Sequence, residues 1–119
     1  MFGKGIYFSD IATKSAQQCF VGQNGVGFLL LVKVAVGKPR NMYVADLNAN
    51  KLPKGFDSTL GLGRNAPSES GFKKFKGMMV PCAKCAKMND DKRFLVYNEY
   101  VVYDVAQTKL EYLLKVKFN

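Results

Sequence analysis

Histidine is missing from this 119-residue chain, and cysteine occurs only three times. Because histidine is the commonest general base and the commonest metal ligand, its absence excludes Ser-His-Asp and Cys-His nucleophile systems built from this chain alone. An odd number of cysteines does not form a disulfide framework, which favours a reducing, intracellular compartment. Catalytic chemistry in this chain therefore has to come from side chains other than imidazole.

Long hydrophobic runs are also missing. The longest, residues 28–36, has nine residues and includes Lys33, whereas a membrane-spanning helix needs about 20 apolar residues. Met1 is not followed by a basic segment and an apolar core, so no signal peptide is expected. We therefore expect no membrane partner.

Acidic residues are few, because nine Asp and Glu stand against 18 Lys and Arg, which gives a formal net charge of +9. This excess favours acidic partners such as nucleic acid or phosphate-bearing ligands. Hydrophobic residues make up 48% of the chain, enough for a packed core, so disorder is not expected. The length fits a single domain, or part of one, over residues 1–119.

The pattern of apolar residues predicts an α+β fold with a mainly antiparallel sheet. A helix is expected over about residues 11–20, with Ser9 or Asp10 as its N-cap. Further segments are predicted as strands, and the last of them alternates apolar and polar residues as a half-buried strand does. These strands cover residues 6–8, 27–36, 78–81, 94–103 and 107–118. Glycine and proline predict loops over residues 48–77 and 82–92.

A carboxylate interrupts the strand expected over residues 94–103. Both faces of that strand are apolar except at Asn98 and Glu99, and a strand of this kind belongs inside a sheet. Burying a charged carboxylate costs free energy unless the group is paired or has a functional role. Two interpretations stay open: Glu99 forms an ion pair with a buried Lys or Arg, or it is a functional carboxylate.

Three further motifs allow both a functional and a purely structural interpretation. Gly3 and Gly5 permit a ligand to approach the backbone closely, or they form a plain turn. Cys82 and Cys85 have the spacing of zinc ligands, but a structural zinc site needs four ligands and no histidine is present, so ordinary thiols are expected. Residues 72–76 alternate aromatic and basic side chains, as on a nucleic-acid stacking surface or in a solvated basic loop.

Three segments carry a family resemblance: residues 1–10 with residues 13–16, residues 96–103, and residues 112–119. Together they resemble the catalytic domain of poly(ADP-ribose) polymerases. The first segment is similar to the nicotinamide-binding segment of that family, the second to the segment that carries the catalytic glutamate, and the third to the last strand. The segments occur in the family's order and cover nearly the whole chain, with the closest resemblance to the DNA-damage-responsive, polymer-forming members.

The resemblance implies a fold, an activity and partners. The fold is the mainly antiparallel ADP-ribosyltransferase fold, of which this chain is the C-terminal portion. The implied activity is transfer of ADP-ribose from NAD+ to acceptor proteins and to growing poly(ADP-ribose) chains, with release of nicotinamide and without a metal. A nuclear location is implied as well, with DNA bound through domains missing from this chain.

The resemblance assigns the nicotinamide site to four residues, and a fifth position, Gln18, departs from the family pattern. Tyr7 is implied to stack on the nicotinamide ring, and Ser15 is implied to hydrogen-bond its carboxamide. Gly5 lies in the turn beside this site, and Lys14 faces the reaction centre. Gln18 stands where relatives carry a second stacking tyrosine, so we do not expect the usual aromatic sandwich to be complete.

The resemblance assigns catalysis to Glu99, while Met1 and Val96 match positions that shape the acceptor pocket. The signature histidine of the family belongs before Met1, so we expect the chain to be an incomplete catalytic domain, either a fragment or the product of a split gene. Two alternatives stay open: a catalytically inactive relative, and a basic nucleic-acid-binding module in which Glu99 is structural.

Overall fold

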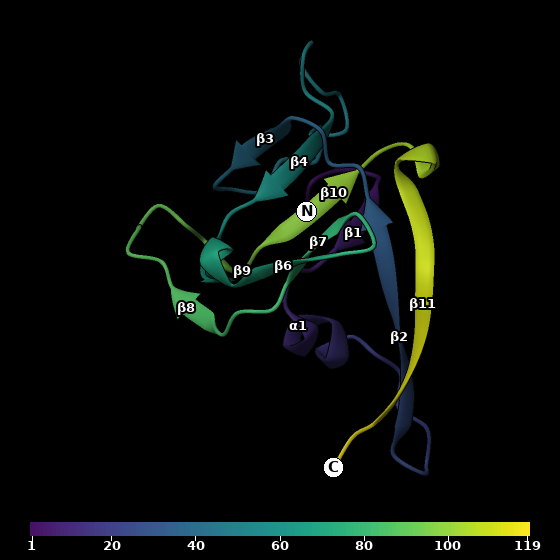
Figure 1. Cartoon of the computed structure of the whole chain (residues 1–119). Helices are drawn as coiled ribbons and strands as arrows, with labels where there is room; N and C mark the ends of the chain where they lie inside the picture. Colours follow the sequence, from purple (N-terminus) through teal and green to yellow (C-terminus); the bar gives the residue numbers. More distant parts are fainter.

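The computed structural model describes all residues from Met1 to Asn119, and it has the α+β class that the sequence predicts. The chain has one α-helix and eleven strands, which form four small sheets, and the strand pairs are mainly antiparallel (Figure 1). None of the helices has the length and the apolar character needed to cross a membrane.

The central sheet has the strand order β1-β10-β4-β3. Its strands are β1 (Ile6–Phe8), β10 (Glu99–Val102), β4 (Ser58–Gly61) and β3 (Pro39–Met42). β10 pairs antiparallel with β1 on one side and with β4 on the other. Glu99 therefore begins an interior strand, as the apolar residues around it predict.

The core of this sheet is small. Phe2, Ala49 and Val101 have no exposed surface and form one cluster. The Tyr103 hydroxyl closes the cluster, because it hydrogen-bonds with the Phe2 carbonyl at 2.9 Å and with Thr59 Oγ1 at 2.8 Å. Only 14 of the 119 residues are buried, so most of the apolar side chains in the composition remain at or near the surface.

β2 (Val26–Val34) and β11 (Thr108–Lys117) form a long antiparallel ribbon along one side of the molecule (Figure 1). Both strands confirm the sequence prediction. The regular alternation expected for β11 is wrong, because the pairing register shifts after Leu110. A bulge of this kind moves the following side chains to the opposite face, and Leu110, Leu113 and Leu114 are 58%, 62% and 43% exposed.

The loop predicted over residues 48–77 is wrong from β4 onward. This stretch also contains β5 (Gly63–Pro67), a short 3-10 helix (Glu69–Gly71) and β6 (Phe72–Phe75). A Cβ at Gly63 would lie 2.2 Å from the carbonyl carbon of Tyr97 in the neighbouring strand. Glycine at this position therefore marks a close contact between strands and not a loop.

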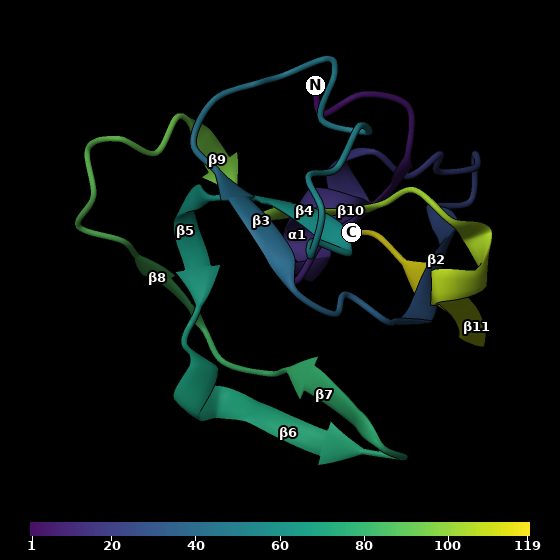
Figure 2. The same cartoon turned by 90° about the horizontal axis from the view of Figure 1, so that it is seen from above.

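The second predicted loop, residues 82–92, is partly wrong as well. It contains β8 (Cys85–Lys87), which pairs with one side of β5, while β9 (Leu95–Tyr97) pairs with the other. β7 (Met78–Pro81) is a strand as predicted and forms a hairpin with β6. Seen from above, this hairpin stands apart from the central sheet, and its tip points toward the side of the β2–β11 ribbon (Figure 2).

The helix is shorter than predicted. α1 spans Ala12–Gln17, and Phe20, which the predicted helix includes, is 90% exposed. Neither Ser9 nor Asp10 is the N-cap, because that position is Ile11, whose side chain makes no capping bond. The Ser9 hydroxyl accepts a hydrogen bond from the Ile11 N–H at 3.1 Å, and Asp10 is held by a tertiary hydrogen bond instead.

Candidate active site

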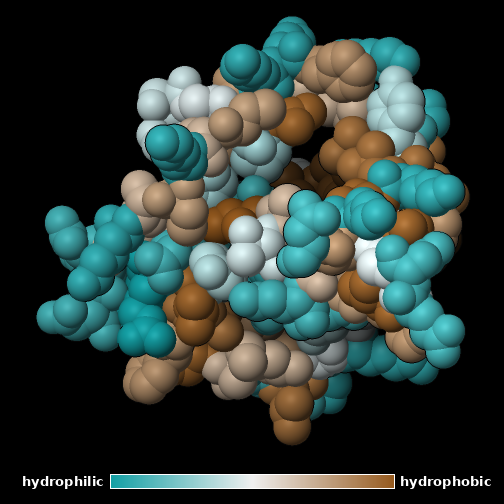
Figure 3. Space-filling view, turned by 90° about the horizontal axis from the view of Figure 1, so that it is seen from below, coloured by the Kyte–Doolittle hydropathy of each residue, from teal (hydrophilic) through white to brown (hydrophobic).

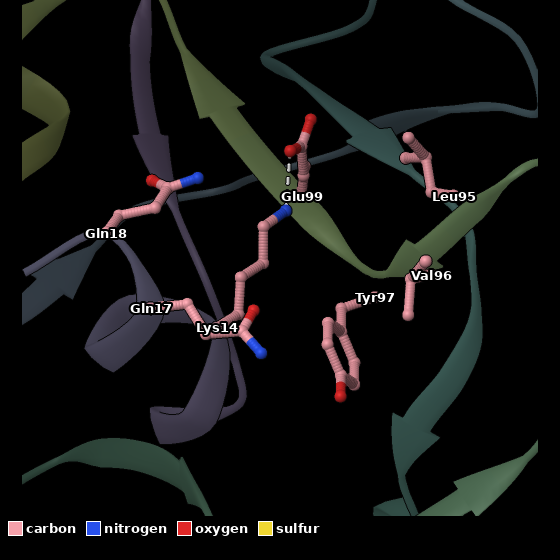
Figure 4. Close-up of a pocket in the computed structure, with 7 residues that line it drawn as sticks. All are labelled: Lys14, Gln17, Gln18, Leu95, Val96, Tyr97 and Glu99. Carbon is pink, nitrogen blue, oxygen red and sulfur yellow. Dashed lines mark hydrogen bonds and ion pairs between the residues drawn. The ribbon is translucent and has the colours of Figure 1, made fainter.

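The strand predicted over residues 94–103 is divided into β9 and β10, and Glu99 is the first residue of β10. Its Oε1 lies 2.5 Å from the Nζ of Lys14, whose side chain reaches out from α1 (Figure 4). The Lys14 and Glu99 side chains are only 16% and 17% exposed. The ion pair allowed by the sequence is therefore present, and its cation is a residue that the family resemblance places at the reaction centre.

Only one oxygen of this carboxylate has a partner. Glu99 Oε2 is buried and makes no hydrogen bond within the chain. A buried acceptor left in this state costs about 1–3 kcal/mol. A hydroxyl or amide donor that enters the site would therefore find an acceptor that is already desolvated.

Glu99 and Lys14 line a pocket of about 400 Å³ between α1 and β9 (Figure 4). Four of the site residues predicted from the sequence meet in it: Lys14, Gln18, Val96 and Glu99. The structure adds three lining residues: Gln17, Leu95 and Tyr97. The α1 side supplies polar groups and β9 supplies mainly apolar ones, a mixture typical of a small-molecule site.

Four other predicted residues lie outside this lining: Met1, Gly5, Tyr7 and Ser15. Tyr7 lies on β1 opposite Val101, so it shares a sheet face with Glu99 at the diagonal spacing, which is about 7–8 Å. Tyr7 is 40% exposed, and its hydroxyl accepts from the Phe2 N–H at 3.0 Å and donates to the Gly3 carbonyl at 2.6 Å. The turn thus holds the ring in place and leaves part of its surface accessible.

Gly5 has a structural explanation in this fold. A Cβ there would lie 2.7 Å from Val101 Cγ1 and 2.8 Å from the Tyr103 ring, so the turn approaches β10 too closely for any side chain. Ser15 is half-buried on α1, directly after Lys14. The roles of Gly5 and Ser15 in binding nicotinamide stay predictions, as does the role of Met1, which is 54% exposed.

The sequence patterns did not point to a polar network beside the site. The buried Asn98 accepts a hydrogen bond from the Gly63 N–H at 2.8 Å and donates one to Asp10 Oδ2 at 2.9 Å. Burial raises the pKa of Asp10 and outweighs the hydrogen bond from Asn98, which lowers it. The available sequence signal is Asn98 itself, because a polar residue inside an apolar strand is usually hydrogen-bonded.

Two motifs of the sequence lie away from this pocket. Cys82 and Cys85 are free, exposed thiols, and the expectation that they bind no zinc stays a prediction. Residues 72–76 form β6 and the tip of its hairpin, so they are not a loop, although their lysines are exposed to solvent as that interpretation expects. Phe75 at this tip is 45% exposed.

Comparison with known proteins matches residues 1–118 to the family model of the poly(ADP-ribose) polymerase catalytic domain. Poly [ADP-ribose] polymerase 1 of Arabidopsis thaliana is 48% identical, and the match covers 100% of this chain and 12% of the relative. Poly [ADP-ribose] polymerase 1 of Danio rerio is 46% identical, with the same coverage of 100% and 12%. Poly [ADP-ribose] polymerase 2 of Homo sapiens is 44% identical, with 100% and 21% covered.

The fold and the family match together define the class as an ADP-ribosyltransferase catalytic domain, or part of one. Within this class, the chain belongs to the poly(ADP-ribose) polymerase family. It spans 12% to 21% of the length of these three relatives. What the complete relatives do therefore does not transfer to this chain directly.

Proposed function

We propose that this chain is the C-terminal portion of an ADP-ribosyltransferase catalytic domain, in which Glu99 is the catalytic carboxylate. The enzyme that contains it transfers ADP-ribose from NAD+ to acceptor proteins and to growing poly(ADP-ribose) chains, with release of nicotinamide. NAD+ is a substrate in this reaction, and no metal takes part. The observation that carries the proposal is the buried, unpartnered Oε2 of Glu99 in a pocket wall.

The chemistry explains why a carboxylate is the residue needed. Cleavage of the nicotinamide–ribose bond resembles glycoside cleavage and passes through an oxocarbenium-like transition state. Nicotinamide leaves a cationic precursor as a neutral molecule, so its departure needs no general acid, and the lack of histidine in this chain removes no acid–base step. The reaction needs a negative group beside the developing positive charge, held in place before the bond breaks.

The two oxygens of Glu99 suit two parts of this task. Oε1 is held by Lys14 at 2.5 Å, which fixes the orientation of the carboxylate. Oε2 can accept a hydrogen bond from a ribose hydroxyl, and it can then orient the acceptor hydroxyl that attacks the ribose. The hydrogen bonds of Oε2 with the ribose hydroxyl and with the acceptor hydroxyl both strengthen as positive charge develops on the ribose, so they act mainly in the transition state.

The other predicted residues take supporting roles in this proposal. The partly exposed ring of Tyr7 stacks on nicotinamide, and Ser15 hydrogen-bonds its carboxamide. Gly5 keeps the turn close to β10. Val96, which is 50% exposed at the pocket, and Met1 border the acceptor.

The names of the relatives, poly [ADP-ribose] polymerases 1 and 2, support polymer formation. We extend the proposal to a nuclear location and to DNA bound by domains outside this chain. The competing functions are a catalytically inactive relative and a basic nucleic-acid-binding module. The pocket around Glu99 favours the enzyme over the nucleic-acid module, since a module of that kind needs no such pocket.

Glu99→Gln tests the proposal, because it keeps the size of the side chain and removes its charge. The test uses a catalytic domain in which the upstream half of the Arabidopsis relative's domain is joined to residues 1–119. Turnover should fall about 10²–10³-fold while the affinity for NAD+ holds. Polymer elongation should suffer more than NAD+ hydrolysis, as measured by polymer length and by release of labelled nicotinamide.

Glu69→Gln is the matched control, since it removes the same charge on the exposed 3-10 helix and should leave turnover unchanged. The melting temperature of the Glu99→Gln variant should change little, because the glutamine oxygen can still accept a hydrogen bond from Lys14 Nζ, and the cost of desolvating a largely buried ion pair offsets much of its attraction. If Glu99→Gln unfolds the domain, or leaves transfer near the wild-type rate, Glu99 is a structural ion-pair partner and the proposal is wrong.

A further inference from the structure

We propose that the tip of the β6–β7 hairpin and the adjoining end of the β2–β11 ribbon form a binding surface for a poly(ADP-ribose) strand. This surface, the lysine–aromatic patch, consists of Lys33, Phe75, Lys76, Lys109 and Tyr112. None of these residues lines the pocket that contains Glu99. The inference rests on the proposed function, because poly(ADP-ribose) is the product of that activity.

A lysine occupies the turn of the hairpin in an unusual conformation. Phe75 pairs with Met78, and between them Lys76 and Gly77 have φ angles of 47° and 76°. Positive φ at both positions is typical of a type I′ turn, where Asn and Gly are the usual residues. Lys76 is the only non-glycine residue of the chain with a positive φ, so the strained position carries a cation.

This lysine anchors the turn on β11. Lys76 Nζ hydrogen-bonds the Tyr112 hydroxyl, and it lies 5.0 Å from the centre of the Tyr112 ring and 5.6 Å from that of Phe75. The two ring centres are 6.3 Å apart, with 39° between the ring planes. One cation and two aromatic rings therefore form a compact group at the junction of the hairpin and the ribbon.

Two more lysines lie on the same face of the β2–β11 ribbon. Lys33 on β2 and Lys109 on β11 are direct partners in the strand register, on the same face as Tyr112, and like charges opposite each other repel. A Cβ at Gly77 would lie 3.9 Å from Lys33 Nζ, which places that ammonium group at the hairpin tip. The carboxylate beside them is Glu111, whose Oε1 lies 3.8 Å from Lys109 Nζ.

The number of positive charges per aromatic pair in the patch fits poly(ADP-ribose) better than a nucleic-acid strand. The three lysines and Glu111 leave two uncompensated positive charges around one aromatic pair. Each unit of poly(ADP-ribose) carries a pyrophosphate and one adenine, whereas a nucleic-acid strand carries a single phosphate charge per base. Phosphate groups between Lys33 and Lys109 would relieve their repulsion, and an adenine can stack on the partly exposed ring of Phe75.

The test is the binding of preformed, fluorescently labelled poly(ADP-ribose) to the completed domain, in which the upstream half of the Arabidopsis relative's domain is joined to residues 1–119, measured by anisotropy without NAD+. K33Q/K76Q/K109Q removes the lysines of the patch, whereas K51Q/K54Q/K115Q removes the same charge at other exposed positions. The patch variant should lose at least about tenfold in affinity and about 2 in the slope of log K against log salt, as for three lost phosphate contacts. The control variant should lose at most about twofold through its lower net charge.

Phe75→Ser is a second variant that keeps every charge. It should weaken binding of poly(ADP-ribose) about fivefold or more and leave binding of inorganic polyphosphate, which has no base, unchanged. In the completed domain, K33Q/K76Q/K109Q should release nicotinamide from NAD+ at the wild-type rate, because none of these lysines lines the pocket that contains Glu99. Failure of catalysis and failure of this surface are therefore distinguishable.

Three results would each overturn the inference. They are equal losses for the two lysine variants, equal affinity for single-stranded oligo(dA) with the same number of phosphates, and unchanged polymer binding by Phe75→Ser. If the patch variant does not fold, as judged by circular dichroism, Phe75→Ser decides alone.

Discussion

At the residue scale, the carboxylates of Glu99 and Asp10 both lie beside β10, but their surroundings differ. Glu99 is paired with the cation of Lys14 at 2.5 Å, lines a pocket and keeps one oxygen open. Asp10 is hydrogen-bonded by the neutral amide of Asn98, and burial raises its pKa. Asp10 Oδ1 is likewise buried without a partner, but Asp10 forms no ion pair and does not line the pocket. The catalytic role is therefore proposed for Glu99 and not for Asp10.

Gln18 allows a residue-scale test of nicotinamide binding. Gln18→Tyr in the completed domain should tighten the binding of nicotinamide-like inhibitors by about twofold to tenfold, because a stacked aromatic pair contributes about 0.5–1.5 kcal/mol. Calorimetric titration measures the change, and Gln23→Tyr, at an exposed position outside the pocket, is the control. Unchanged or weaker binding by Gln18→Tyr would show that no ring stacks at this end of α1.

At the scale of secondary structure, the division of one strand at Asn98 positions the site. β9 pairs in parallel with β5, while β10 pairs antiparallel with β1 and β4. The chain therefore passes from one sheet to another at Asn98, and Glu99 is the first residue of the new strand. Glycine at position 63 allows β5 and β9 to lie close together at this point, because a side chain there would collide with the backbone of Tyr97.

Asn98→Ala should destabilise the fold by about 2–3 kcal/mol, because the Gly63 N–H and Asp10 Oδ2 both lose their partner. Urea denaturation of the completed domain measures this change in the free energy of unfolding. Asn41→Ala, at an exposed position of β3, should stay within about 0.5 kcal/mol of wild type. An equally small change for Asn98→Ala would mean that these hydrogen bonds do not hold the passage between the sheets.

The whole molecule exposes more surface than its mass predicts. Its accessible surface is 8239 Å² at 13.2 kDa, whereas a folded monomer of this mass exposes about 6,400 Å². The radius of gyration of the Cα atoms is 14.8 Å, against about 13.5 Å for a compact chain of this length. Figure 3 shows connected groups of apolar side chains on one face of the molecule, as expected for a surface that another chain segment covers.

We expect the isolated chain to self-associate, because it exposes apolar side chains and unpaired strand edges. Sedimentation velocity should show species larger than a monomer, and an apolar fluorescent dye should bind. Joining the upstream half of a relative's catalytic domain should reduce both effects. A monodisperse monomer that melts cooperatively would contradict the prediction, and it would count against the proposal that the chain is part of a larger domain.

The sequence by itself determined the fold class and the long strands of the ribbon. It also pointed to Glu99, whose catalytic role stays a prediction. Hydrophobic periodicity and similarity to a family depend on residues that are close together in the sequence, so both can be recognised without the tertiary structure. It did not determine β3, β4, β5, β6 and β8. The glycines and prolines in these strands look like loop signals. Some of them are needed for close contacts with distant strands, as Gly63 is beside Tyr97.

Only the tertiary structure decided which side chains meet. Lys14 and Glu99 are 85 residues apart in the sequence, and Lys76 and Tyr112 are 36 apart. Strand order and register bring each pair together, and they also set Lys33 opposite Lys109. Order and register follow from burial over the whole chain, whereas composition and periodicity act over a few residues, so no local pattern contains these contacts.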